Sequence, residues 1–206
     1  MWYWLFKYVI VGPLVRLRFR VAVLGAEHIP KRGPAILAAN HLAESDSLLI
    51  PLVTRRRITF VAKSDYFRTR SWRRWGLRRA GQIPLERSGG DAARAALDAA
   101  GSVVSGGGVW AIYPEGTRSA DGRLHKGHTG CARVALEHNA PIVPVAIIRH
   151  GGERRWRDAV VIRVGATIAP SGTARELTDA VMAEIGRLGG QPRSDRYARS
   201  TPPQSC

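Results

Sequence analysis

The chain has 206 residues, and 45% of them are apolar, which is enough for the core of one domain. Lysine and arginine total 32 against 16 acidic residues, so the net charge of +16 indicates a polyanionic partner: nucleic acid, an anionic membrane or a phosphorylated substrate. The two cysteines, Cys131 and Cys206, exclude a disulfide framework and a zinc site built from cysteines.

Residues 1–24 form the most apolar stretch of the chain. Lys7 and Arg16 interrupt it, and its longest uncharged run is too short to cross a bilayer. Aromatic residues that favour the membrane–water interface lie near its start. We expect Pro13 to break a helix here and the alternating residues 16–21 to form a strand with one basic face. We predict that this segment anchors the protein at a membrane surface; the alternative is a helix that packs back on the core.

Strands and helices are predicted to alternate through the rest of the chain. Short apolar runs predict strands at 35–39, 58–62, 81–87, 109–113, 142–148 and 160–164. Helical patterns lie at 47–52, 65–79, 90–104, 129–138 and 173–188. This order predicts one α/β domain, residues 25–188, with a mixed, mostly parallel central sheet flanked by helices. The polar, basic residues 189–206 are predicted to form a disordered tail.

The predicted helix at 65–79 is rich in arginine. Trp72 and Trp75 lie among these arginines, three residues apart and so on one side of the helix. Basic residues mixed with tryptophan fit an anionic lipid surface, and a solvated basic face is the alternative.

His41 directly follows the predicted strand 35–39, and Asp46 lies five residues later, near the start of a helix. A histidine that acts as a base needs a fixed tautomer, which a nearby carboxylate supplies by accepting the proton of the other ring nitrogen. The spacing H-x4-D therefore predicts a catalytic pair. Taken alone, this spacing also fits a loop histidine followed by an aspartate that caps the helix.

Two other predicted strands end in residues suited to bind phosphate. Arg87 ends one of them, and the segment 115–118 follows another. If the strands are neighbours, these residues face the same sheet edge as the predicted base. Arg87 and Arg118 would hold a phosphate by fork-shaped hydrogen bonds, with Thr117 as a neutral donor. Gly116 would let a ligand approach the backbone closely.

No protein nucleophile is evident in the sequence. It lacks a G-x-S-x-G turn and a G-x4-G-K-[ST] phosphate loop, and Cys131 lies within a predicted helix. We therefore predict that the nucleophile is a substrate hydroxyl deprotonated by His41. His41, Glu44 and Asp46 could make a metal site, but no second histidine cluster completes it, and we predict no metal and no resident cofactor.

Four stretches match, in order, the motifs of the glycerolipid acyltransferases. They are NHLAESD with His41 and Asp46, GQIPLER ending in Arg87, YPEGTRS with Glu115, Gly116, Thr117 and Arg118, and APIVPVAI with Pro141 and Pro144. Over about residues 30–150 the chain thus resembles this family, and specifically its 1-acyl-glycerol-3-phosphate acyltransferase type.

The resemblance implies a glycerol-3-phosphate acyltransferase-like fold and a step of phospholipid biosynthesis at the cytoplasmic face of the membrane. A fatty acyl group would pass from acyl-CoA, or from acyl carrier protein, to the sn-2 hydroxyl of lysophosphatidic acid and give phosphatidic acid. His41 would be the general base, oriented by Asp46. The residues implied to bind the acceptor are Arg87, Glu115, Gly116, Thr117, Arg118 and Lys126. The fourth motif would shape the acyl pocket or the core.

Departures from the motifs leave the acceptor open. Glu86 stands where the second motif usually has aspartate, and Glu44 and Ser45 replace the common aromatic or apolar residues of the first. HKGHTG, with Lys126, stands where the family often has a phenylalanine–lysine pair. Glycerol-3-phosphate or a lysophospholipid such as lysophosphatidylinositol is therefore an alternative acceptor. A non-catalytic basic protein that binds nucleic acid or membranes is a second alternative, but no nucleic-acid-binding module is visible, and we expect no nucleic-acid partner.

Overall fold

The computed structural model describes residues 2–63, 82–85, 90–150 and 157–198. Within them a seven-stranded sheet crosses the molecule in the order β1-β7-β6-β2-β5-β3-β4. Its strands are β1 (Phe19–Leu24), β2 (Ala35–Ala39), β3 (Ile58–Lys63), β4 (Gln82–Leu85), β5 (Val109–Ile112), β6 (Ile142–His150) and β7 (Asp158–Val164). β6 and β7 pair antiparallel, and every other neighbouring pair is parallel. The predicted single α/β domain with a mixed, mostly parallel sheet is confirmed.

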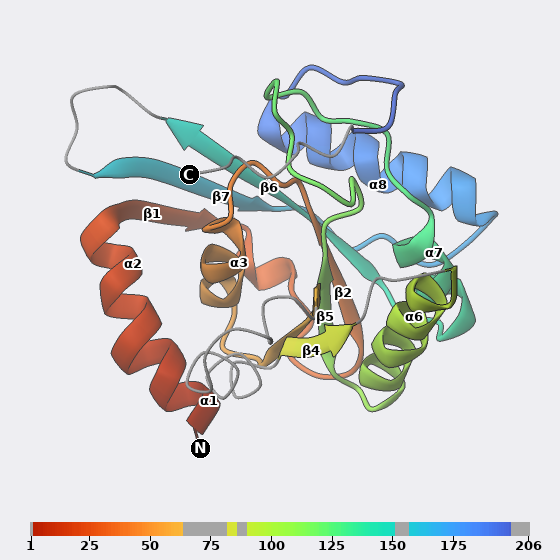
Figure 1. Ribbon diagram of the computed structural model, residues 1–206, viewed down its shortest axis with the longest axis horizontal. Helices are drawn as coiled ribbons and strands as arrows, with labels where there is room; N and C mark the ends of the chain where they lie inside the picture. Colours follow the sequence, from red (N-terminus) through yellow and green to blue (C-terminus); the bar gives the residue numbers. More distant parts are fainter. Residues whose placement is uncertain (1, 64–81, 86–89, 151–156, 199–206) are drawn as a thin grey trace.

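Helices pack on both faces of this sheet (Figure 1). One face carries α6 (Gly90–Ser105), α7 (Gly130–Glu137) and α8 (Ala174–Gly189), and the other carries α2 (Gly12–Arg18), α3 (Asp46–Leu49) and the 3-10 turn η3 (Ile50–Val53). Side chains of the central strand β2 alternate between the two cores, with Ile36 on the side of α8 and Leu37 on the side of α3. Because both faces are covered, β2 is an unbroken apolar run in the sequence.

Outside the N-terminal segment, most described elements agree with the predicted ones to within two residues, and β2 has the predicted bounds. The helix predicted at 47–52 ends as α3 at Leu49 and continues as the 3-10 turn η3. α8 begins at a capping box, in which the side chains of Thr173 and Glu176 each accept from the backbone amide of the other. The predicted helix 65–79 and the predicted phosphate ligand Arg87 lie outside the described residues.

The N-terminal segment differs most from the prediction. Residues 2–18 are helical throughout, as α1 (Trp2–Leu5), the π-helical η1 (Phe6–Val11) and α2. Pro13 does not break this helix: it lies near the start of α2, directly after the widened π turn η1, where the hydrogen-bond ladder changes from the π to the α pattern. The strand predicted at 16–21 begins only at Phe19, so it is wrong for its first residues.

Two polar contacts dock the N-terminal helix onto the sheet. The buried Lys7 ammonium donates a hydrogen bond of 2.5 Å to the Thr54 oxygen, and the Ile58 amide donates to the Tyr3 hydroxyl at 3.1 Å. Burial lowers the pKa of Lys7 to about 8. One face of the helix therefore packs on the core. This packing is the alternative that the sequence analysis gave to a membrane anchor.

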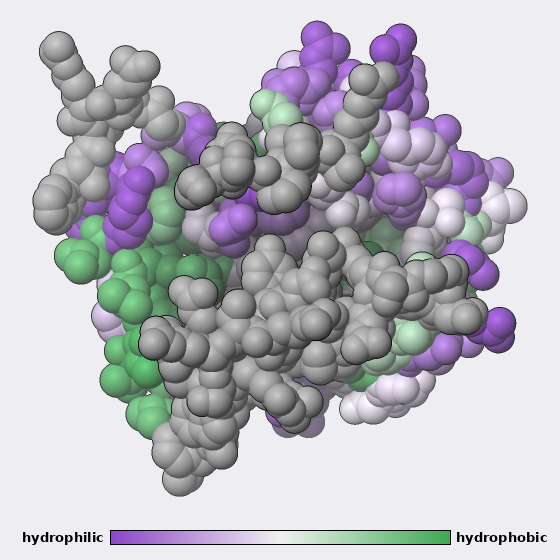
Figure 2. Space-filling model, viewed as in Figure 1, coloured by the Kyte–Doolittle hydropathy of each residue, from purple (hydrophilic) through white to green (hydrophobic). Residues whose placement is uncertain are grey.

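The other face of the N-terminal helix is apolar and exposed (Figure 2). Its exposed large side chains are Trp4, Leu5, Tyr8, Val9, Ile10, Leu14 and Leu17. Globular domains seldom expose so many apolar neighbours, so this apolar helix face has the composition of an interaction surface. In the part of the chain that the structure describes, no helix combines the length and the apolar character needed to cross a membrane.

The predicted disordered tail is corrected over its first half. Residues 190–198 follow α8 and run along the loop after β5. The Leu124 amide donates to the Pro192 oxygen, and the Leu124 oxygen accepts from the Ser194 amide, both at 2.9 Å. Leu124 is also buried, and this burial with the hydrogen bonds offsets the entropy lost on ordering a polar segment. Residues 199–206 lie outside the described residues.

Candidate active site

Two of the predicted site segments meet at one edge of the sheet. β2 and β5 are parallel neighbours, so the residues that follow them leave the sheet at the same edge. His41 follows β2, and residues 115–118 follow β5. The two loops touch, because the Ser119 amide donates a hydrogen bond of 2.8 Å to the His41 oxygen. The convergence expected from the sequence is thus present for these two segments, whereas Arg87 is not described.

His41 and Asp46 form a hydrogen-bonded pair. Nδ1 of His41 lies 3.1 Å from Oδ2 of Asp46, whose side chain is fully buried while that of His41 is 16% exposed. The same carboxylate oxygen accepts hydrogen bonds from the amides of Leu42 and Ala43, at 2.7 and 2.8 Å. Asp46 therefore closes the turn between β2 and α3 and orients the imidazole at the same time. This arrangement leaves Nε2 of His41 as the ring nitrogen for a substrate.

The second oxygen of Asp46 is held by Arg149, from β6. Nη2 of Arg149 donates to Oδ1 of Asp46 at 2.5 Å and to the Ser45 hydroxyl at 2.8 Å. Burial by itself raises the pKa of Asp46, but hydrogen bonds from His41, a backbone amide and Arg149, with the charge of Arg149, hold it below its ordinary value. Asp46 is therefore ionised at any pH at which an imidazole can act as a base.

Tyr113, which follows β5, packs against the ring of His41. The two ring centroids are 4.0 Å apart and the planes are inclined by 11°. The Tyr113 hydroxyl lies 3.3 Å from that of Ser47, and burial raises the pKa of Tyr113, so the phenol stays neutral. A neutral aromatic face favours the imidazole when it gains a proton, because the π electrons attract the positive charge.

Glu115 has a different role from the predicted one. Its side chain is 1% exposed, and its two oxygens accept hydrogen bonds from the backbone amides of His41 at 3.2 Å and His125 at 2.9 Å. Burial raises the pKa of Glu115, against these hydrogen bonds. Both oxygens are engaged, and a carboxylate charge repels phosphate. The structure therefore moves Glu115 from acceptor binding to joining the two loops of the site.

The other residues of this segment lie nearer the surface. Arg118 is 47% exposed and forms an ion pair of 3.2 Å with Glu44, which is 71% exposed. Gly116 is exposed with a φ of 73°, and Thr117 is half-buried. An exposed ion pair contributes little to stability, so the Arg118 guanidinium can exchange Glu44 for the phosphate of a ligand at low cost.

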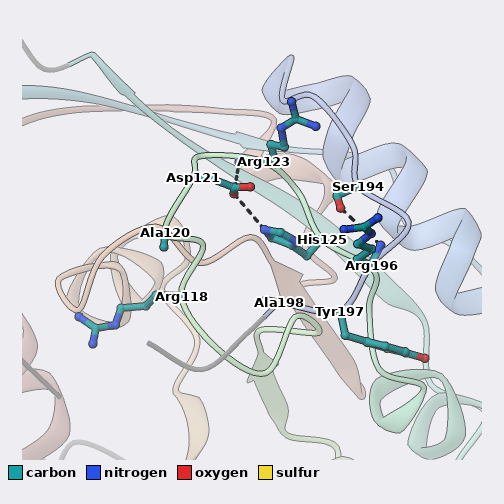
Figure 3. A pocket seen from close by; sticks show the side chains of 9 residues that line it. All are labelled: Arg118, Ala120, Asp121, Arg123, His125, Ser194, Arg196, Tyr197 and Ala198. Atoms are coloured by element: carbon teal, nitrogen blue, oxygen red, sulfur yellow. Dashed lines mark hydrogen bonds and ion pairs between the residues drawn. The ribbon is translucent and has the colours of Figure 1, made fainter. Parts of the chain in front are cut away.

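The C-terminal segment 190–198 walls a pocket of about 500 Å³ next to this loop (Figure 3). The pocket is lined by Arg118, Ala120, Asp121, Arg123, His125, Ser194, Arg196, Tyr197 and Ala198. The side chains of Arg118 and Arg123 extend in different directions and do not form a ready clamp for one phosphate. Lys126 does not line this pocket, but its ammonium packs over the ring of the lining residue Tyr197, 5.5 Å from the centroid.

Asn40, Tyr113 and Arg149 are site residues that reasoning from the sequence missed. Asn40 is buried and exchanges two hydrogen bonds with the backbone of Ile147, at 2.9 and 2.7 Å, and it donates to the Gln191 side chain at 2.6 Å. All three missed residues lie at the carboxyl ends of β2, β5 and β6, which are parallel to one another. The rule that pointed to His41 would therefore have found them.

The described residues offer neither a reactive thiolate nor a cluster of metal ligands. Cys131 is buried in α7, and burial raises the pKa of its thiol to about 11, so it does not supply a thiolate near neutral pH. Among the described residues, no group of three or more His, Cys, Asp or Glu side chains is arranged to hold a metal ion. The His41–Asp46 pair is the arrangement at this edge that suits proton transfer.

Known proteins resemble this chain in sequence. A family model described as Acyltransferase matches residues 20–148. The chloroplastic 1-acyl-sn-glycerol-3-phosphate acyltransferase of Brassica napus is 26% identical over 134 residues, which cover 65% of this chain and 38% of that protein. The alpha form of the enzyme from Homo sapiens is 31% identical over 135 residues, which cover 62% of this chain and 45% of the human protein. The chain thus spans less than half the length of these two curated relatives.

A solved structure shares the fold. The crystal structure of the 1-acyl-sn-glycerophosphate acyltransferase from Thermotoga maritima aligns with a TM-score of 0.69 and 25% identity, over 88% of this chain and 78% of that one. The matching family model covers more than half of the chain and includes the His41–Asp46 pair and residues 115–118. The resemblance predicted from the four motifs is confirmed, and the chain belongs to the acyltransferase family.

Proposed function

We propose that this protein transfers a fatty acyl group from acyl-CoA to the sn-2 hydroxyl of 1-acylglycerol-3-phosphate and so makes phosphatidic acid. The observation that carries the proposal is the His41–Asp46 pair, which lies at the same sheet edge as the exposed Arg118. Membership of the acyltransferase family supports catalysis over a non-catalytic basic adaptor. The relatives named above are 1-acylglycerol-3-phosphate acyltransferases, which supports this acceptor.

In the proposed reaction, Nε2 of His41 removes the proton from the acceptor hydroxyl. The alcohol oxygen attacks the thioester carbonyl carbon, a new C–O bond forms, and the C–S bond to CoA breaks. The CoA thiolate then takes the proton from the imidazolium. Asp46 stabilises the positive imidazolium through the 3.1 Å contact to Nδ1. Arg118 binds the acceptor phosphate. The acyl thioester is a substrate, and the proposed reaction uses no cofactor.

The acceptor and the donor are tested together on purified protein with liposomes. Acyl-CoA and acyl carrier protein thioesters are each offered with lysophosphatidic acid, glycerol-3-phosphate and lysophosphatidylinositol. We expect phosphatidic acid as the main product, formed from acyl-CoA and lysophosphatidic acid. A faster reaction with another acceptor would reassign the substrate, and no acyl transfer in any combination would refute the proposed activity.

Arg118→Ala, in the same assay, tests how the acceptor is held. Removal of a charge-assisted hydrogen bond of about 1.5–3 kcal/mol should raise KM for lysophosphatidic acid about 10- to 100-fold and change kcat less. Arg133→Ala removes an exposed arginine from α7 and serves as the control. An unchanged KM in Arg118→Ala would remove the phosphate role.

We further propose that the protein works as a peripheral enzyme at the cytoplasmic face of the membrane, through the apolar helix face. Arg16 and Arg20 are exposed beside this face, and the chain carries a net charge of +16. Apolar side chains flanked by arginines fit the interface of an anionic bilayer, where an acyl chain and a lysophospholipid are both at hand.

Replacing exposed side chains of the apolar helix face should weaken this association. Val9 and Leu17 are 61% and 59% exposed, so Val9→Ser with Leu17→Ser leaves the docking contacts of the helix intact. Each side chain that enters the bilayer contributes about 1.5–3 kcal/mol, so the double variant should bind anionic vesicles at least about 10-fold more weakly in cosedimentation. Leu24→Ser changes an exposed apolar side chain on β1, outside the apolar helix face, and should bind as the wild type does. Equal binding by all three proteins would contradict the proposal.

A further inference from the structure

We propose that Arg149 is a positioning residue for the acyl-transfer reaction and acts on His41 through Asp46. The inference rests on the proposed function. Arg149 lies on β6, which pairs in parallel with β2, the strand that leads to His41. It follows the residues that match the family model, which end at 148.

The contacts of Asp46 divide its carboxylate into two halves. Oδ2 receives the imidazole of His41 and two backbone amides, and Oδ1 receives Nη2 of Arg149 at 2.5 Å. A carboxylate can rotate about its bond to Cβ, and a donor on only one oxygen would leave this rotation less constrained. With both oxygens engaged, the plane of the carboxylate is set, and Oδ2 stays in line with Nδ1 of His41.

The guanidinium of Arg149 contacts two residues besides Asp46. Its Nη2 also donates to the Ser45 hydroxyl at 2.8 Å, and its Cζ atom lies 5.6 Å from the ring centroid of Phe19. The side chain of Arg149 is 20% exposed, compared with 0% for Asp46. A buried carboxylate needs a counter-ion when its histidine partner is neutral, and Arg149 supplies that charge throughout the reaction.

Arg149 should also affect how the site responds to pH. The other ionisable groups that face the His41–Asp46 pair are Glu115 and Tyr113, which both follow β5, and Arg149 from β6. Of these, Arg149 alone carries a permanent positive charge. Its removal favours both protonation of Asp46 and retention of the proton by the imidazolium, and both changes extend the acid-inactive range to higher pH.

The test replaces Arg149 by methionine or lysine in the full chain. In Arg149→Met we expect kcat to fall about 10- to 100-fold, the range for removing an outer partner of an active-site group, with little change in KM for the acceptor. The acid limb of the pH–rate profile should move to higher pH. Arg149→Lys keeps the charge and should keep the wild-type acid limb. Arg163→Met removes an exposed arginine from the neighbouring strand β7 and is the matched control.

A double-variant cycle then identifies the route of action. If Arg149 acts through Asp46, adding Arg149→Met to Asp46→Asn should lower kcat by less than about 3-fold further. This double variant also lacks the buried charge pair, so it remains testable if Arg149→Met alone does not fold. The inference would be overturned if the kcat losses of Arg149→Met and Asp46→Asn multiplied in the double variant. It would also be overturned if Arg149→Met alone kept the wild-type kcat and the wild-type acid limb. If the wild-type protein transfers no acyl group, the proposed function has failed instead, and a titration of the His41 ring by NMR in wild type and Arg149→Met tests the Arg149 contact without turnover.

Discussion

His41→Ala is expected to abolish acyl transfer while the protein stays folded. The imidazole is the base in the proposed reaction, and loss of general-base catalysis costs about 10²- to 10⁴-fold in kcat. Asp46 keeps the amides of Leu42 and Ala43 and the guanidinium of Arg149 as partners, so its carboxylate does not become an unpaired buried charge. The free energy of unfolding should therefore fall by only about 1–2 kcal/mol.

The measurement for this variant is kcat with lysophosphatidic acid at saturation, together with a thermal unfolding curve. His138→Ala is the control. This histidine lies between α7 and the start of β6 and contacts Ser105, whereas His41 lies beyond the carboxyl end of β2. The control should keep its activity. A His41→Ala protein that is folded and retains the wild-type kcat would end the proposed mechanism.

Asp46→Asn should have the second large effect, on activity and stability together. An asparagine at this position cannot stabilise the imidazolium or secure its tautomer, and in a Ser-His-Asp protease the corresponding change costs about 10⁴-fold in kcat. The variant also leaves Arg149 without its carboxylate. Breaking a buried ion pair from one side costs about 3–5 kcal/mol, a large part of the stability of a domain of this size.

The pH dependence of stability provides a separate test of Asp46. Its pKa in the folded protein lies below the ordinary value of 3.8, so the folded state favours the ionised carboxylate. This contribution is fully present above pH 3.8 and is lost as the pH falls through the folded pKa. Urea unfolding of wild type between pH 7 and pH 3 should therefore show a loss of stability toward acid that is smaller in Asp46→Asn.

Asp179→Asn is the matched control for this second prediction. Asp179 forms a surface pair with Arg175 on α8, and its side chain is 51% exposed. Such pairs contribute about 0–1 kcal/mol, so the control should keep both activity and stability. If Asp46→Asn behaved like the control in kcat and in its acid profile, the role of Asp46 would have to be abandoned.

Most of the secondary structure was predictable because the elements have strong local signals. β2 has the predicted bounds, since a strand covered on both faces is a continuous apolar run. α8 follows from its helical periodicity, and a capping box at Thr173 and Glu176 marks its start. The continuity of the N-terminal helix through Pro13 was not predicted, because proline is a strong local signal for a helix break and composition does not reveal the π turn that precedes it.

In the site, too, local contacts were predictable from the sequence and contacts between distant segments were not. The pairing of His41 with Asp46 is local, five residues apart across one turn, and the spacing together with the later motifs predicted it. The role of Glu115 depends on two amides from different loops, and sequence reasoning placed its carboxylate on the acceptor instead. A motif identifies the type of residue, but burial and hydrogen-bond partners decide what its charge can do.

The sequence by itself determined the order of strands and helices, the family motifs and the local His41–Asp46 pair, because these depend on residues close together in the chain. Only the tertiary structure decided that Arg149 holds the far oxygen of Asp46 from 103 residues away and that residues 190–198 pack along the loop after β5. Both contacts join segments distant in sequence, and their partners are set by the pairing of β6 with β2 and by the packing of the chain after α8. No local pattern encodes such distances, and they exist only once the sheet has formed.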